Sequence, residues 1–194
     1  MTSKPNWLFG AVALALTLCG AVTSEPGLAQ AHRKIAASRF VRMMAAVPSP
    51  SMKPDQVNTA VWDKAWTNLV NDAEQSFTPS MPKLLAVEVE LVVGNPGPLQ
   101  DQLTLTVLDA KRQTVAVVTE TVQASACEHT MFVISKDGVD VQPGETYRLK
   151  LTGGTLFGWK YIVGGYEKGA ATFHGRPLLP KAHSTFLFRT FGAE

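Results

Sequence analysis

The chain has 194 residues, of which 45% are hydrophobic and 18% are charged, so its length allows one globular domain with a full hydrophobic core and short appendages. The formal net charge of +2 is uneven, because from Pro48 onward thirteen Lys/Arg stand against fifteen Asp/Glu. The body therefore has no overall basic field to attract nucleic acid, and we expect no nucleic-acid partner.

The N-terminus has the pattern of an export signal. Lys4 supplies a positive charge, residues 7–22 are largely apolar, and Ala29-Gln30-Ala31 matches the small-x-small pattern that a signal peptidase cleaves. The apolar run is short for a membrane span. We predict that residues 1–31 are a signal peptide cleaved after Ala31, with a retained anchor as the alternative. The mature chain would then be periplasmic or extracellular, without a transmembrane segment.

The two cysteines bear on the same question. A lipoprotein signal places its lipid-modified cysteine where Cys19 lies, but the bulky Leu18 precedes it where a small residue is needed. An ordinary cysteine of the signal peptide is therefore favoured over lipid anchoring. Removal of the signal leaves Cys127 as the only cysteine, so no disulfide can form within the mature chain.

Residues 32–54 form a basic leader followed by a Pro/Ser linker. Lys34, Ser38 and Arg42 recur at four-residue intervals, which predicts a basic amphipathic helix that would lie on an anionic membrane or contact a partner. A poorly ordered leader is the other interpretation.

Between residues 55 and 72 the pattern is mixed. Trp62 and Trp66 are four residues apart, and Val57, Val61, Ala65 and Leu69 repeat at the same interval, which favours an amphipathic helix. An irregular first strand with a long loop is the alternative. We expect these tryptophans to cap the domain rather than to contact a sugar.

Short strands separated by turn residues follow. Residues 85–93 alternate apolar residues with Ala86, Glu88 and Glu90, which predicts one buried and one solvated face. Further strands are predicted over residues 103–107, 114–122, 131–134, 147–151 and 184–191. No long helical pattern interrupts them, so we predict an all-β, antiparallel, jelly-roll-like β-sandwich over residues 55–194.

The stretch 157–175 is the candidate binding region, because it sets five aromatic residues among glycines. Alternation places Phe157, Trp159 and Tyr161 on one face. Exposed, these rings would form a platform on which sugars stack; turned inward, they would belong to the core. The candidate ligand-binding residues are Trp159, Lys160, Tyr161, Tyr166, Glu167, Phe173, His174 and Arg176.

Several short motifs resemble those of a known class of domain. They are Asp55-Gln56, Gln75-Ser76-Phe77-Thr78-Pro79, Val87-Glu88-Val89, Pro143-Gly144, Tyr147-Arg148-Leu149 and Phe188-Arg189-Thr190-Phe191-Gly192. Together they resemble a secreted bacterial jelly-roll module, similar in outline to carbohydrate-binding sandwich domains, over about residues 55–192. The resemblance implies an exported or surface protein. It carries over no ligand-binding residue, and we expect this domain to stand alone rather than beside a catalytic domain.

The sequence offers no catalytic constellation. It contains no Gly-x-Ser-x-Gly motif, and Cys127 and His129 have no third residue to orient them. Glu88 and Glu90 share a strand face, as surface glutamates commonly do. We therefore predict that the protein is not an enzyme.

The spacing of His, Cys, Asp and Glu in the sequence gives little support for a metal site. His174, His183 and Glu167 lack the paired spacing of a zinc site. Jelly-roll modules often carry a structural calcium ion, for which the candidate oxygen ligands are Asp72, Glu74, Asp137 and Asp140, but these form no calcium-binding loop. We predict no cofactor.

Three functions remain open. The first is binding of a glycan or cell-surface polymer. The second is a structural or adhesive envelope domain that contacts other proteins, and the third is an unrecognised hydrolase.

Overall fold

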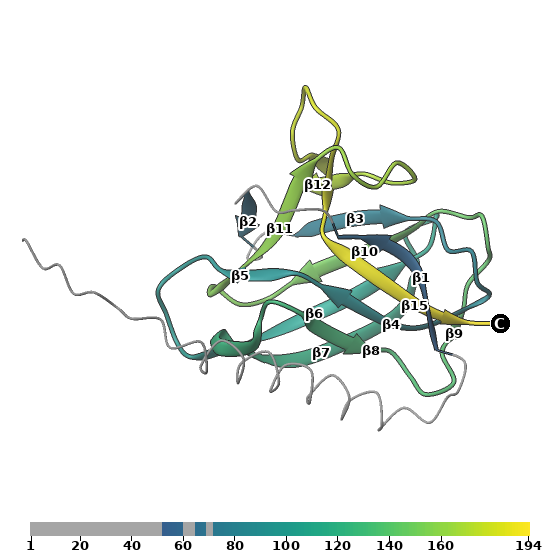
Figure 1. The fold of residues 1–194 in the computed structure, drawn as a ribbon, viewed down its shortest axis with the longest axis horizontal. Coiled ribbons are helices and arrows are strands. Elements are labelled where there is room, and N and C mark those ends of the chain that lie inside the picture. The colour runs from purple at the N-terminus through teal and green to yellow at the C-terminus, as the bar shows by residue number, and fades with distance from the viewer. Residues whose placement is uncertain (1–51, 60–64, 69–71) are drawn as a thin grey trace, which may run out of the picture. The chain divides into compact units, whose positions relative to one another are not determined.

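The computed structural model describes residues 52–59, 65–68 and 72–194, which fold into three antiparallel β-sheets (Figure 1). Their single helical element is a short 3-10 turn, η2 (Ala124–Ala126). Within these ranges no helix has the length and apolar character needed to cross a membrane. The prediction of an all-β antiparallel sandwich is confirmed.

The first sheet has the strand order β1-β15-β4-β8, and β8 and β9 pair with successive parts of β4. Its strands are β1 (Lys53–Asn58), β15 (Phe188–Ala193), β4 (Lys83–Val89), β8 (Thr130–Val133) and β9 (Val139–Asp140). β15, the last strand in chain order, lies between β1 and β4.

The second sheet has the order β13-β12-β3-β10-β6-β7. Its strands are β13 (Arg176–Pro177), β12 (Ala171–Phe173), β3 (Ala73–Phe77), β10 (Tyr147–Thr152), β6 (Gln100–Leu108) and β7 (Thr114–Gln123). Along β6 and β10 the predicted alternation is confirmed, since Leu103, Leu105 and Leu149 are buried and the residues between them are half-exposed.

The third sheet is small and has the order β14-β11-β2, with β5 also paired to β11. Its strands are β14 (Ser184–Phe186), β11 (Phe157–Val163), β2 (Trp66–Asn68) and β5 (Leu91–Val93). β4 continues through Glu90 into β5, and β14 continues through Leu187 into β15. These two segments of the chain, paired as β4 and β15, separate at Glu90 and Leu187. Beyond that point, β5 and β14 pair with successive parts of β11.

Three backbone hydrogen bonds hold this point, which we call the strand fork. The amide of Glu90 donates to the carbonyl of Leu187 (3.2 Å), the amide of Leu187 donates to the carbonyl of Lys160 (3.0 Å), and the amide of Lys160 donates to the carbonyl of Glu90 (3.1 Å). The three residues thus close a ring in which each donates to one neighbour and accepts from the other. The predicted single strand over residues 184–191 is therefore two strands, divided at Leu187.

One hydrophobic core joins the three sheets. The indole of Trp159 stacks on Phe186 with ring centroids 4.4 Å apart, and its N–H donates to the carbonyl of Leu187 (2.9 Å). Phe77 of the second sheet meets Phe188 of the first at 6.4 Å. The rest of the core is aliphatic and comes from facing strands, including Val87, Val89, Leu103, Leu105, Val107, Leu149 and Leu151.

The helix predicted between residues 55 and 72 is wrong for the residues that the structure describes. β1 pairs with β15, and β2 pairs with β11. Trp66 covers Gly158, where an added Cβ would lie 2.2 Å from the indole ring. Pairing with strands distant in sequence therefore overrides the local helical spacing. Trp62 and Leu69 lie outside the described residues.

The solvated face predicted for β4 is also wrong. Glu88 is 3% exposed, and Ala86 is fully buried in a small cluster with Met131 and Phe191. Both faces of β4 are therefore covered, which explains why alternation in its sequence did not mean alternation in exposure. The predicted signal peptide, its cleavage, Cys19 and the leader up to residue 51 lie outside the described residues and stay predictions.

Replacing Trp159 by alanine tests how far the core depends on this side chain. We expect Trp159→Ala to lower the free energy of unfolding by about 3–5 kcal/mol, because a large buried ring is removed and a cavity is left. Val163→Ala, at the 59% exposed end of the same strand, is the control and should change it by less than about 0.5 kcal/mol. Urea denaturation measures both values, and equal stability of the two variants would contradict the assignment.

Candidate functional site

The rings predicted to form a sugar-binding platform lie mostly inside the protein. Trp159 is 0% exposed and Tyr166 is 9% exposed, so neither offers a face to a ligand. Tyr161 and Phe173 are half-buried and pack against the core. The inward orientation that the sequence left open therefore holds for Phe157 and Trp159, because the strand fork turns this face of β11 toward Phe186.

Tyr166 anchors the segment 164–183, which we call the lobe. Its hydroxyl donates to Oε1 of Gln56 (2.8 Å) and accepts from the amide of Thr78 (3.1 Å). Its ring meets Phe188 edge to face at 5.2 Å. Burial raises the pKa of Tyr166, so the hydroxyl stays protonated and keeps its donor role.

A buried hydroxyl closes the base of the lobe. Oγ1 of Thr185 accepts from the side-chain amide of Asn58 (3.1 Å) and donates to the carbonyl of Gly164 (2.6 Å). The amide of Gly164 donates to the carbonyl of His183 (2.8 Å), and the ring of His183 lies 3.2 Å from the carbonyl of Tyr166. The two ends of the lobe are thus held together, and in its middle β12 pairs with β3.

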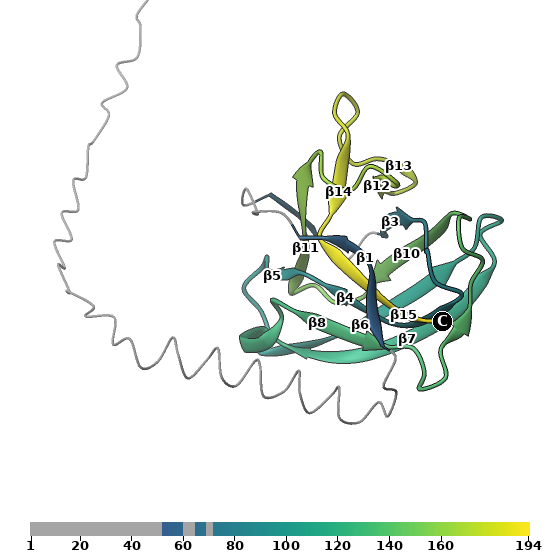
Figure 2. The same ribbon diagram turned by 45° about the vertical axis from the view of Figure 1, so that its right-hand side comes forward.

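The lobe is cationic, whereas the rest of the described body is acidic. It carries Lys168, Arg176 and Lys181 against the single acid Glu167, and all four side chains are exposed, as are His174 and His183. The other described residues have nine Lys/Arg and thirteen Asp/Glu. Figures 1 and 2 show the loop between β13 and β14 extending away from the sheets.

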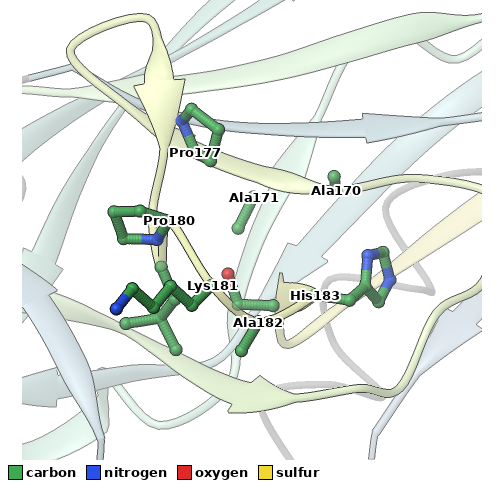
Figure 3. Close-up of a pocket in the computed structure, with 9 residues that line it drawn as sticks. Ala170, Ala171, Pro177, Pro180, Lys181, Ala182 and His183 are labelled. Atoms are coloured by element: carbon green, nitrogen blue, oxygen red, sulfur yellow. The ribbon is translucent and has the colours of Figure 1, made fainter.

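Two pockets border the lobe. In the first, Lys181 and His183 lie on opposite sides and Ala171 lies between them (Figure 3). The second lies between the lobe and β1 and is lined by Gln56, Val57, Asn58, Thr59, Gly165, Tyr166, Glu167 and Lys168. Of the predicted site residues, Tyr166 and Glu167 line the second pocket, near Thr78 at one end of β3. Phe173, His174 and Arg176 line neither pocket and lie near Asp72 and Ala73 at the other end of β3.

Lys160 was predicted at the rim of the site but lies in a different place, near the strand fork. It is 5% exposed, and its ammonium lies 3.3 Å from Glu128 and 4.0 Å from Glu90. Lys160 is therefore part of a partly buried ionic cluster on the outer face of β4 and does not contribute to the lobe.

The same cluster holds Glu88. Its carboxylate accepts from the guanidinium of Arg189 (2.7 Å) and lies 3.5 Å from Nδ1 of His129. The hydrogen bond that His129 donates to Glu88 raises the pKa of His129, and burial raises the pKa of Glu90. Since Glu88 is held by two basic groups, the cluster satisfies its own charges.

Cys127 does not have the environment of a nucleophile. The side chain is 7% exposed and packs in the main core, and burial raises the pKa of its thiol. A catalytic cysteine needs its thiolate stabilised, which is the opposite effect.

The candidate metal ligands are dispersed. Within the described ranges no three His, Cys, Asp or Glu side chains gather as a metal ion would require. The four acids considered for calcium are each near a cation: Asp72 near Lys150, Glu74 near Arg112, Asp137 near Lys136 and Asp140 near Lys83.

The sequence reasoning missed two features. It did not group Lys168 and Lys181 with Arg176, although counting charge over residues 164–183 would have separated this segment from the acidic body. It also missed the polar anchor formed by Asn58 and Thr185, for which the sequence carries no local signal, because these residues are 127 positions apart.

Gly169 lets the lobe approach β3, which predicts a steric effect of substitution. An added Cβ would lie 1.9 Å from the carbonyl oxygen of Ser76, whereas at Gly97 the nearest atom is 3.7 Å away, and neither glycine has a positive φ. We expect Gly169→Ala to cost about 1–3 kcal/mol of stability and Gly97→Ala almost nothing. Thermal unfolding compares the two, and equal melting temperatures would contradict the close approach.

The pair of His129 and Glu88 predicts a dependence of stability on pH. Because the folded pKa of His129 is raised above 6.5, its contribution is complete below pH 6.5 and is lost as the pH rises through the folded value. The difference in unfolding free energy between the wild type and His129→Gln should therefore shrink as the pH rises. His174→Gln, in the exposed lobe, is the control. An NMR titration midpoint for His129 at or below 6.5 would refute this explanation.

Comparison with other proteins does not identify a family for this chain. A scan against protein-family models found no match, and a search of curated proteins found none either. The resemblance to jelly-roll modules therefore stays a prediction from the sequence.

Proposed function

We propose that the chain is a non-catalytic, exported binding module, and that its lobe binds an anionic glycan or cell-surface polymer. The observation that carries the proposal is the separation of charge, with three Lys/Arg and one Glu on the lobe of an otherwise acidic described body. A cationic segment on an acidic domain attracts ligands of negative charge and directs them to that segment.

The surface around the lobe suits a polymer better than a small enclosed ligand. One pocket is formed almost entirely by the lobe itself and the other lies between the lobe and β1, and each includes a lysine, Lys181 in the first and Lys168 in the second. Half-buried Phe173, next to His174 with ring centroids 4.4 Å apart, adds apolar surface near the cations. Ionic contacts would then supply most of the binding free energy, and contacts with the edge of Phe173 would supply a smaller part.

The rings of Trp159 and Tyr166 have no direct part in this binding mode. Their task is to support the lobe, one within the core and one at the base. The proposal thus keeps the ligand class expected from the sequence and replaces the aromatic platform by a cationic surface.

The non-catalytic part of the proposal is supported by how the reactive groups are used. Cys127 is a core thiol whose pKa burial raises, and Glu88 is held by Arg189 and His129. Both are engaged in the structure and neither borders the two pockets beside the lobe. Export is proposed from the N-terminal sequence pattern.

Binding to alginate, a polyanionic polysaccharide, tests the function, with neutral dextran as the comparison. We expect the protein to bind alginate more weakly as salt rises and not to bind dextran. The double variant Arg176→Ala/Lys181→Ala should lose about tenfold in affinity, which corresponds to about 1.4 kcal/mol. Microscale thermophoresis at two salt concentrations measures these values.

The matched control removes two exposed cations elsewhere, by Lys111→Ala/Lys136→Ala. This variant should bind alginate like the wild type. Equal loss in both double variants would reduce the effect to net charge, and binding to dextran or no binding to alginate would overturn the proposal. Absence of binding to alginate would favour the other expectation from the sequence, an envelope domain that contacts proteins.

A further inference from the structure

The first pocket beside the lobe has a buried floor and an exposed rim. Two of its lining residues, Ala171 and Ser184, are 2% and 3% exposed and form the floor. Lys181 and His183, on opposite sides of the pocket, are exposed (Figure 3). The volume of about 330 Å³ is near the lower end of the range of about 300–1,000 Å³ that is usual for ligand pockets. The pocket therefore has room for one ring-sized group.

Ser184 is a buried polar residue at the end of a core-facing side of β14. It shares this side of the strand with the fully buried Phe186, because alternate residues of a strand point the same way. Its backbone pairs with Val163 of β11, but its hydroxyl makes no hydrogen bond to any residue that the structure describes. A buried hydroxyl without a partner is unfavourable. Since Ser184 lines the pocket, a molecule in the pocket is the partner that its hydroxyl can reach.

The two sides of the pocket add groups of different chemistry. Lys181 forms no ion pair with the described residues, so its ammonium is available to an anion. Nε2 of His183 lies 3.2 Å from the carbonyl oxygen of Tyr166. Because a carbonyl oxygen only accepts, Nε2 carries a proton, and in the neutral ring Nδ1 is the nitrogen that can accept from a ligand. The pocket thus combines a cation, a hydroxyl and an imidazole.

We propose that this pocket holds one acidic sugar unit, a hexuronate, of the anionic polymer that binds the lobe, an inference that rests on the proposed function. Lys181 pairs with the carboxylate, Ser184 and His183 bond to ring hydroxyls, and the ring lies over Ala171. A hexuronate carries its carboxylate directly on the ring, so one unit presents charge and hydroxyls within a small pocket. A neutral sugar would leave Lys181 without a partner, and a simple anion would leave Ser184 and His183 without one.

Ser184→Ala separates binding from folding. Because the hydroxyl has no partner among the described residues, we expect an unchanged melting temperature but about three- to tenfold weaker binding to alginate, as for the loss of one hydrogen bond. Thr185→Ala is the contrast, since that hydroxyl bonds to Asn58 and Gly164, and its loss should lower the melting temperature. Ser125→Ala, at an exposed serine of η2, should bind alginate like the wild type. Thermal unfolding and microscale thermophoresis measure these effects.

Sodium glucuronate tests the pocket without the polymer. In an NMR titration of the protein purified from its full-length gene, we expect glucuronate to shift the amide signals of residues 170, 171 and 181–184. The signals of β7, on the far border of the same sheet as β12, should not move. Glucose at the same concentration should cause smaller shifts. Lys181→Ala should remove this preference for glucuronate over glucose.

The results distinguish the pocket from the function of the lobe. Equal shifts with glucose and glucuronate, shifts that avoid the pocket, or unchanged alginate affinity in folded Ser184→Ala would each refute the assignment of the pocket, while alginate binding by the lobe would stand. A wild type that does not bind alginate would refute the proposed function instead. The glucuronate titration would then still decide whether the pocket accepts an acidic sugar.

Discussion

The ring of hydrogen bonds among Glu90, Lys160 and Leu187 is the constraint on which the rest of the structure depends. It turns two paired strands apart and seats both along β11, so a third sheet is made from continuations of the first. The same turn directs Trp159 onto Phe186 and fixes its indole N–H to Leu187. Each of these three residues hydrogen-bonds to both of the others through its backbone, which fixes the orientation of β11. Its aromatic face, with Trp159, therefore points into the core.

The charged side chains near the fork differ from those of the lobe in their exposure. On the outer face of β4, Glu88 and Lys160 are nearly inaccessible and are matched with Arg189, Glu90 and Glu128. Desolvation of such a cluster is unfavourable, and the contacts offset it only when every charge has a partner. The cations of the lobe have few such partners, and their side chains are exposed to ligands in the solvent.

How much the sequence could predict follows the range of the interactions. The strands of β6 and β10 are readable because Leu103, Leu105 and Leu149 alternate with polar residues, and that period is local. The burial of Glu88 and Trp159 is not readable, because each depends on partners about 30 to 100 residues away. For the candidate site, the sequence singled out the region through Tyr166, His174 and Arg176. It left the orientation of the rings open, since alternation shows which residues share a face but not which way the face points.

The position of β15 has a consequence for how the protein acquires its structure. This strand comes after every other described strand in the chain, yet it is an interior strand that gives β1 and β4 a common neighbour. Neither early strand can complete its pairing until residues 188–193 arrive, so β1 joins β4, β8 and β9 in the first sheet only after β15 is made. A topology with such distant pairings folds slowly, and the nascent chain spends its synthesis with the halves of that sheet still apart.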